Sequence, residues 1–365
     1  MCARTMAQES APQPLTLQLD RFEYRHISSI DQLAQTFSAR VFILLQIPAQ
    51  EVEARKETRF PLGDTDDDDE DKPRFKSARW YLSMLRIHNM AEGGSVQTNV
   101  VTGADGGLEC SMLVSGTFHV MFELREFPLD RQFLYVHLKS LCANEKKVPV
   151  RLEVPEGCLA TVDAENFALS NVWRLRPSVA VENKPTNMQE LGLSYPGLRF
   201  VLCVHRRPDY YIVNIVMPTA LIVLLTGAQF RIAAEDVANR IDVGLTLLLT
   251  AVAFKLVTSN MTPEVAYLTL LDRYVGVSNV IIVLAVMAAA VASEVDDTFD
   301  RAAVWSLLGL WLVLNFWFVA RVLAARARTS PASDGHRQVR RASKALIGTD
   351  PQRAASALTR PIDVS

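Results

Sequence analysis

Four long apolar segments in the second half of this chain constrain most strongly what it can fold into. Three carry no charged residue, namely Tyr210–Phe230, Tyr274–Ser293 and Ala302–Ala320. Each is long enough to cross a hydrocarbon core of about 30 Å as a helix. The fourth, roughly Ile241–Val257, is apolar apart from Asp242 and Lys255. Buried core helices are the other interpretation of such runs, but four of them so close together favour membrane spans.

The fourth segment carries a stripe of evenly spaced positions. They are Asp242, Thr246, Leu249, Ala253, Leu256 and Asn260. Spacings of four and three residues place all six on one narrow face of a helix, at about 100° per residue. An acid and a threonine at membrane depth are costly unless they face water or other protein. A water-lined pore is the simplest arrangement that satisfies them.

The first 205 residues alternate apolar and polar side chains in several short segments. The clearest are 118–124, 134–138 and 198–204. A period of two is typical of half-buried antiparallel strands, and turn clusters such as 103–107 separate these segments. The fold class is therefore α+β, with an antiparallel β-sandwich followed by a four-helix transmembrane bundle.

These patterns predict four regions. A flexible extension of residues 1–26 precedes a sandwich of residues 27–207, and four spans occupy residues 208–326. A basic tail, residues 327–365, is expected to be disordered. The acidic run Asp64–Asp71 has no calcium-loop spacing and is interpreted as a solvated loop rather than a divalent-cation site.

No enzyme chemistry is evident in the sequence. The five cysteines suggest neither a metal site nor a disulfide framework, and Cys203 is expected opposite the apolar face of its strand. No nucleophile–base constellation stands out. We therefore expect a protein that is not an enzyme, with no cofactor, no metal and no nucleic-acid partner.

Several motifs, in order along about residues 27–326, resemble one family. They are Phe127-Pro128-Leu129-Asp130-Arg131-Gln132, then Arg206, Asn214, Pro218 and Arg240, and finally Pro263, Tyr267, Thr269 and Asp272. Trp80–Asn89 is a weaker match. On these anchors the chain resembles the pentameric ligand-gated ion channels, the Cys-loop receptor superfamily.

The chain also departs from the animal members of that family. Val120 and Leu134 stand where those members place the two cysteines of the loop, and the linker Glu294–Arg301 is short. Both features resemble the prokaryotic branch. The aromatic box that binds amines is not evident, since Leu141–Val154 has no aromatic residue. A cationic transmitter is therefore not expected.

The resemblance implies a homopentamer whose pore is lined by the stripe. Five copies of Asp242 would form an acidic ring that favours cations, and Leu249 with Ala253 would form an apolar constriction. Asp242 could instead cap the helix or pair with Arg240, and Leu249 could simply pack between helices.

The resemblance also implies coupling and ligand residues. Coupling between the domains is expected from Phe127, Pro128, Asp130, Arg206, Thr262 and Pro263. Asp130 and Arg206 correspond to a buried pair of the family, although Asp130 could instead cap a turn. The ligand-binding candidates are Trp80, Trp173 and Tyr195, and the agonist is expected to be a small organic molecule or the proton. A non-conducting membrane sensor with the same fold is the alternative function.

Topology draws on two conflicting signals. The residues through Gln18 are polar and lack the apolar core of a signal peptide. The tail from Arg321 is basic and the loop 294–301 is acidic, so the positive-inside rule would place the tail in the cytoplasm. The resemblance implies the opposite orientation. We expect the orientation that the resemblance implies. The protein would then cross the plasma or inner membrane several times, with the sandwich outside the cytoplasm.

Overall fold

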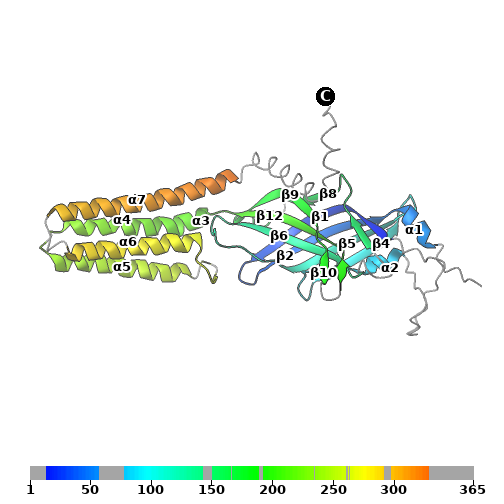
Figure 1. Ribbon diagram of the computed structural model, residues 1–365, viewed down its shortest axis with the longest axis horizontal. Coiled ribbons are helices and arrows are strands. Elements are labelled where there is room, and N and C mark those ends of the chain that lie inside the picture. Colours follow the sequence, from blue (N-terminus) through cyan, green and yellow to red (C-terminus); the bar gives the residue numbers. More distant parts are fainter. Residues whose placement is uncertain are drawn as a thin grey trace, which may run out of the picture. The chain divides into compact units, whose positions relative to one another are not determined.

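The chain forms two compact units in a computed structural model. The residues described are 14–56, 78–142, 150–165, 167–188, 192–233, 235–259, 262, 264–291 and 297–328. The first unit extends to Arg207 and also includes Thr262–Tyr267, and the second contains Pro208–Met261 and the chain from Leu268. The strands belong to the first unit and the long helices to the second (Figure 1). The domain limits expected from the sequence did not include the return of 262–267 to the first unit.

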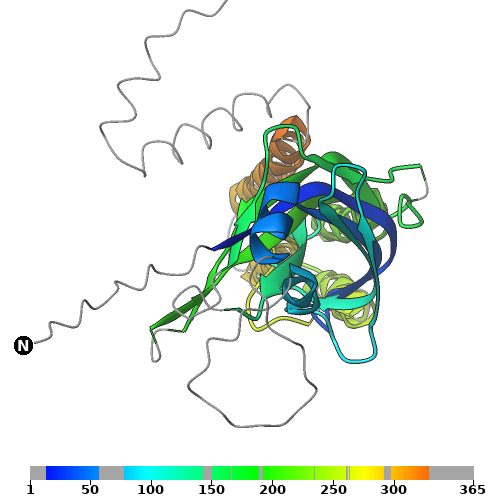
Figure 2. The same cartoon turned by 90° about the vertical axis from the view of Figure 1, so that its right-hand side faces the viewer.

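Two sheets make up most of the first unit (Figure 2). The first sheet has the order β4 (Ser95–Thr102), β5 (Leu108–His119), β2 (Thr36–Ile47), β1 (Leu15–Asp31) and β7 (Val150–Glu153), and β8 (Leu159–Val162) also pairs with β1. The second has the order β3 (Leu85–Ile87), β6 (Arg131–Ser140), β12 (Gly197–Arg206) and β9 (Trp173–Asn183). Smaller elements are α1 (Ala49–Lys56), α2 (Ala78–Ser83) and the hairpin of β10 (Thr186–Met188) and β11 (Leu193–Tyr195).

Alternating side chains fill the space between the two sheets. β2 buries every second residue from Phe37 to Ile47, as a strand with one face on the core does. Phe22 of β1 stacks on Phe200 of β12, with ring centroids 3.8 Å apart. Tyr24 donates its hydroxyl to the Phe200 carbonyl at 2.9 Å. The strands expected over 134–138 and 198–204 are confirmed as parts of β6 and β12.

The sandwich begins earlier than expected. β1 starts at Leu15, and Leu15, Leu17 and Leu19 are fully buried, so the expected flexible extension of 1–26 is wrong from Leu15 onward. The same alternation that identified the later strands is present in this segment. β1 also pairs in parallel with β7 and β8, so the sandwich is not purely antiparallel.

The segment 120–124 is not a strand, although the sequence predicted one. β5 ends at His119. Val120, Phe122 and Leu124 are still buried, so the period of two is real. Their backbone amides, however, donate to the Gln35 carbonyl, the Gln35 side chain and the Tyr267 hydroxyl, respectively. Alternation reports which side chains are buried and not which groups accept the backbone hydrogen bonds.

Four helices in the described part of the second unit are long and apolar enough to cross a membrane. The first span is built from α3 (Asp209–Tyr211), a π-turn (Ile212–Val216), α4 (Met217–Thr226) and a 3₁₀ turn (Gly227–Arg231). The others are α5 (Val237–Ser259), α6 (Leu270–Val291) and α7 (Asp297–Arg328). Pro218 has no amide to continue the ladder, which fits the wide turn just before α4. α6 packs against each of the other three.

α7 begins inside the segment that the sequence assigned to a loop. Asp297–Arg301 are helical, so that part of the expected linker 294–301 is corrected. The acidic run 64–71 and the tail from residue 329 lie outside the described residues.

Candidate pore helix and buried ion pairs

Helix α5 has two opposite faces. Arg240, Gly244, Ala251 and Thr258 are buried in the unit. Asp242, Thr246, Leu249, Ala253 and Leu256 are exposed, with Leu249 at 70% and Leu256 at 73%. At about 100° per residue the exposed set lies on the side of the helix opposite the buried set. The stripe found in the sequence therefore faces away from the helices of its own chain, while its last member, Asn260, lies outside the described residues.

Arg240 has a partner other than the one considered from the sequence. Its Nη1 and Nη2 atoms donate to Oδ1 and Oδ2 of Asp300 at 2.9 and 2.6 Å. Its Nε and Nη2 also donate to the Ile232 carbonyl, and its side chain is only 2% exposed. The alternative pairing of Arg240 with Asp242 is therefore wrong. Arg240 instead joins the start of α5 to the start of α7.

Asp242 does not cap α5 either. The helix begins at Val237, so Asp242 lies inside it. No hydrogen bond or ion pair joins its carboxylate to another side chain in the part of the chain that the structure describes. Thr246, in contrast, donates its hydroxyl to the Asp242 carbonyl at 2.8 Å. The Thr246 hydroxyl is therefore satisfied within the helix, whereas the Asp242 carboxylate still needs polar surroundings.

The second constellation is a buried ion pair at the end of β12. Arg206 donates from Nε to Asp130 Oδ1 at 2.7 Å and from Nη2 to Oδ2 at 3.2 Å, and both side chains are at most 3% exposed. Gln132 adds a bond from Nε2 to Asp130 Oδ2 at 2.6 Å. A two-point guanidinium–carboxylate contact with further support is among the strong polar interactions of proteins. The pair predicted from the sequence is confirmed as a contact.

Two aromatic rings enclose the Arg206 guanidinium. Its Cζ lies 4.8 Å from the centroid of Phe127 and 4.2 Å from that of Trp173. Trp173 is 3% exposed and faces Arg206 across the pairing of β9 with β12. The indole of Trp173 therefore packs on this cation, and whether Trp173 also contacts a ligand stays a prediction.

In the segment after α5, Tyr267 makes two contacts within the first unit. The Leu124 amide donates to the Tyr267 hydroxyl at 2.9 Å, and the Arg125 guanidinium lies 5.6 Å from the Tyr267 ring centroid. Pro128 is buried, and Thr262 is half-buried. Pro263, expected to take part in coupling, lies outside the described residues.

The ligand candidates are not brought together. Trp173 pairs with Arg206 at one end of β12, whereas Tyr195 precedes the other end, at Gly197. The ring of Tyr195 carries the Lys139 ammonium at 4.6 Å. Trp80 belongs to α2, and its side chain lies outside the description. The face of Tyr195 is therefore already in contact with a cation of the same chain.

The positions of the missing loop cysteines are apolar and buried, with Val120 at 2% and Leu134 at 0% exposure. Cys110, Cys142, Cys158 and Cys203 are free thiols. Cys203 lies on the strand side opposite the core, as expected, yet it is buried.

Sequence reasoning missed three partners. Asp300 was assigned to a loop, Trp173 to a ligand site, and Tyr267 was noted only as part of a motif. Spacing along the chain carries no signal for such contacts, since Asp300 is 60 residues from Arg240 and Tyr267 is 143 from Leu124.

Comparison with known proteins gives matches of one kind. Residues 215–306 match the family model described as the neurotransmitter-gated ion-channel transmembrane region. The acetylcholine receptor subunit alpha-type acr-7 of Caenorhabditis elegans is 27% identical over 46% of this chain and 31% of its own length. The glutamate-gated chloride channel subunit beta of Haemonchus contortus is 28% identical over 53% of this chain and 44% of its own length. The human neuronal acetylcholine receptor subunit alpha-9 is 25% identical over 56% of this chain and 42% of its own length. The matches span less than half the length of each of these relatives.

Proposed function

Because the chain belongs to the superfamily of pentameric ligand-gated ion channels, the Cys-loop receptors, we propose that five identical copies form a ligand-gated channel. The protein is a multi-pass membrane protein with its N-terminal domain outside the cytoplasm. The sandwich would bind the agonist, a small organic molecule or the proton, and the stripe of α5 would line the pore.

The observation that carries this proposal is the exposed stripe of α5. Asp242 lies on the helix face that the other three helices leave uncovered, and its charge cannot face lipid at low cost. A closed ring of five copies would turn these faces toward one another and toward water. A mass measurement in detergent that finds only monomers or dimers would count against the ring.

Selectivity is proposed to come from Asp242. The named relatives include a chloride channel as well as acetylcholine receptors, so relatedness alone does not choose the ion. Five carboxylates around one pore attract cations and repel anions. Among the described residues no cation is paired with this side chain, since Arg240 is held by Asp300.

Leu249 is proposed as the gate. It is the most exposed apolar residue in the middle of the stripe, and Leu256 lies two turns further along the same face. A narrow apolar ring stops ions by excluding water. Leu249→Ala removes most of the side-chain volume that narrows this ring, so the channel should open at lower agonist concentration. An unchanged concentration dependence would assign the gate to another ring.

Coupling is proposed to run through the Asp130–Arg206 pair. Arg206 lies at the end of β12, and the first span begins at Asp209. The guanidinium is fixed by Asp130, Phe127 and Trp173, so a displacement of these loops would be passed to the backbone that leads into the span. An agonist can drive this only by binding the open state better than the closed one.

Recordings under voltage clamp test the proposal. Asp242→Asn should shift the reversal potential in a salt gradient toward that of a less cation-selective pore, or lower the single-channel conductance. Glu92→Gln, the same charge change at an exposed site in the sandwich, is the control. If Asp242→Asn behaves like the control, selectivity lies elsewhere. An assembled pentamer that never conducts, across a screen of protons and small organic molecules, would favour the non-conducting sensor.

A further inference from the structure

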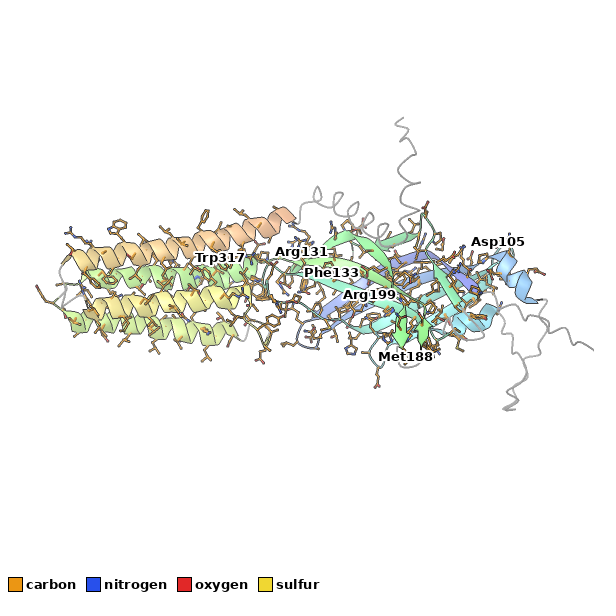
Figure 3. The ribbon with its side chains drawn as sticks, in the orientation of Figure 1. Asp105, Arg131, Phe133, Met188, Arg199 and Trp317 are labelled. Carbon is orange, nitrogen blue, oxygen red and sulfur yellow. The ribbon has the colours of Figure 1, made fainter. Side chains whose placement is uncertain are left out.

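The second sheet carries polar side chains on the face that points away from the core. Val136 of β6 and Phe200 of β12 point into the core and are fully buried, so their neighbours His137 and Arg199 point the other way. The register of the two strands places Arg199 directly opposite His137. These two side chains are therefore neighbours on the outer face of the sheet, where Figure 3 labels Arg199.

Arg199 lies over an aromatic ring but has no acid paired with it. Its Cζ is 4.5 Å from the ring centroid of Tyr135. Among the described residues nothing forms a hydrogen bond or an ion pair with its guanidinium, and its Nε is a buried atom without a partner. Glu182 faces Arg199 from β9, but it is exposed and makes no ion pair with it. A buried donor without an acceptor is rare in folded proteins, so an acceptor for this Nε is expected.

Three other arginines of the first unit show what the same arrangement holds elsewhere. Each lies over an aromatic ring and pairs with a carboxylate of its own chain, namely Arg25 over Phe42 with Glu23, Arg125 over Tyr267 with Glu123, and Arg206 over Phe127 with Asp130. Their Cζ atoms lie 4.4 to 5.6 Å from the ring centroids, and their nitrogens lie 2.7 to 3.2 Å from the carboxylate oxygens. A ring under the guanidinium plane leaves its N–H groups free to bind two oxygens. Arg199 repeats the ring contact without a carboxylate.

A second cation lies beside Arg199 on the same face. Lys139 follows His137 by two residues and pairs with Gly197, so it is the diagonal neighbour of Arg199, at a distance of about 7–8 Å. Its Nζ is 4.6 Å from the ring centroid of Tyr195, and no ion pair joins it to an acid of the described residues. A carboxylate placed above His137 can therefore contact both cations.

His137 forms the floor between the two cations. It is 5% exposed, and its Nε2 lies 3.2 Å from the Lys184 carbonyl oxygen, so Nε2 carries the proton and donates it to this oxygen. Burial lowers the pKa of His137, the hydrogen bond to the Lys184 carbonyl raises it, and the charges of His88, Arg199 and Lys139 lower it further. Every side-chain charge that shifts this pKa is positive. The local field above His137 therefore favours an anion.

We propose that Arg199 and Lys139 bind the carboxylate of a small organic anion on the outer face of the second sheet. Arg199 offers paired N–H groups to the two carboxylate oxygens, and Lys139 adds a second positive charge. The rings of Tyr135 and Tyr195 hold the two cations in place. A carboxylate is the anion that the other ring-bound arginines of this unit hold. The site lies within the first unit, so binding there does not require that the pore conducts.

The test is the melting temperature of the whole protein in detergent, titrated with sodium acetate while sodium chloride is lowered to keep the ionic strength constant. A ligand that binds the folded state raises its stability with concentration, so the titration gives the affinity. Acetamide, the uncharged counterpart of acetate, should have no effect.

Arg199→Gln should weaken acetate binding about 10-fold or more, because it removes hydrogen bonds to a charged group. Arg25→Gln is the matched control. It removes an arginine that also lies over a ring but already holds Glu23, so the response to acetate should stay unchanged.

Two further variants protect the result from a folding artefact. Lys139→Gln leaves the guanidinium in place and should weaken acetate binding by up to about fivefold. Glu182→Gln removes the acid that faces Arg199 and should tighten acetate binding by a similar factor, which a damaged fold cannot do. If acetate raises the melting temperature no more than chloride does, or if Arg199→Gln responds to acetate as Arg25→Gln does, the proposal is overturned.

Discussion

Two buried glutamines show how differently the two units treat their polar groups. Gln132, in the sandwich, accepts from the Glu123 amide and donates to the Glu123 carbonyl and to Asp130. Gln229, at the end of the first span, is fully buried, and neither its Nε2 nor its Oε1 has a partner among the described residues. Its Oε1 lies so close to Gly244 of α5 that a Cβ there would stand 2.6 Å away.

The difference shows which unit satisfies more of its buried polar groups from its own residues. The sandwich satisfies Asp130, Arg206 and Gln132 from its own residues. Among the residues that the structure describes, the helical unit leaves the side-chain amide of Gln229 and Oδ1 of Asn279 without partners, and it exposes large apolar side chains such as Trp305 and Phe316, at 70% and 77%. A lone orphaned amide is expensive in a dry interior. Among the described residues, the helical unit is therefore the one whose own side chains leave more buried polar atoms unpartnered and more large apolar side chains uncovered.

The largest effect is expected from breaking the Asp130–Arg206 pair. Asp130→Asn leaves the Arg206 guanidinium without its counter-charge inside the sandwich, which costs about 3–5 kcal/mol for a buried pair. Thermal unfolding in detergent, together with the yield of assembled protein, measures it.

Glu123→Gln is the matched control for Asp130→Asn. It removes an exposed partner of Arg125, 3.2 Å away in the same loop, and surface pairs contribute about 0–1 kcal/mol. Equal melting temperatures for the two variants would show that the sandwich does not depend on its buried pair.

A smaller loss is expected from the buried pair of the helical unit. Asp300→Asn removes one partner of Arg240, but Arg240 keeps two bonds to the Ile232 carbonyl, and the Asp300 side chain is 16% exposed. We expect a cost of about 1.5–3 kcal/mol, the range for hydrogen bonds to charged groups. The readouts are melting temperature and agonist sensitivity. If Asp300→Asn loses more stability than Asp130→Asn, the helical unit depends on its buried ion pair more than the sandwich does.

Much of this architecture could be predicted from local pattern. Period-two segments identified β6 and β12, and apolar length identified the four spans. The stripe of α5 was visible because a helix repeats every 3.6 residues, so spacing alone reports a shared face. The Asp130–Arg206 pair came from motif resemblance rather than from spacing.

What could not be predicted depends on contacts between distant segments. Alternation over 120–124 indicated a strand, yet its amides bond to Gln35 and Tyr267, because burial and hydrogen bonding are set by different neighbours. The contact of Trp173 with Arg206 could not be predicted, since an exposed and a buried tryptophan look alike in sequence. Asp300 lies in an acidic segment, and the sequence does not indicate which of its acids contacts Arg240.

The two glutamines themselves give the next prediction. Gln132→Met leaves Asp130 Oδ2 and the Glu123 backbone without partners and should cost about 1–3 kcal/mol. Gln229→Met replaces an unpartnered amide by an apolar chain of similar length, so stability should stay unchanged or rise. Melting temperatures of both variants in the same detergent measure the contrast. If Gln229→Met destabilises as much as Gln132→Met, a partner for Gln229 exists in the assembly.

The smallest effect at neutral pH concerns His205, an exception to the satisfied interior of the sandwich. Its pKa is lowered from 6.5 to about 4 by burial and by three arginines, so the unfolded chain binds a proton more readily than the folded one. Stability from this group is therefore fully present above about pH 6.5 and is lost as the pH falls from there toward 4. His205→Asn removes this term. The difference in melting temperature between parent and variant should be constant above pH 7 and should shift in favour of the variant between pH 6.5 and 4. If the difference in melting temperature between parent and variant stays constant from pH 8 to 4, the imidazole is not held neutral. The sandwich would then tolerate a buried charge at His205, just as the helical unit tolerates the unpartnered amide of Gln229.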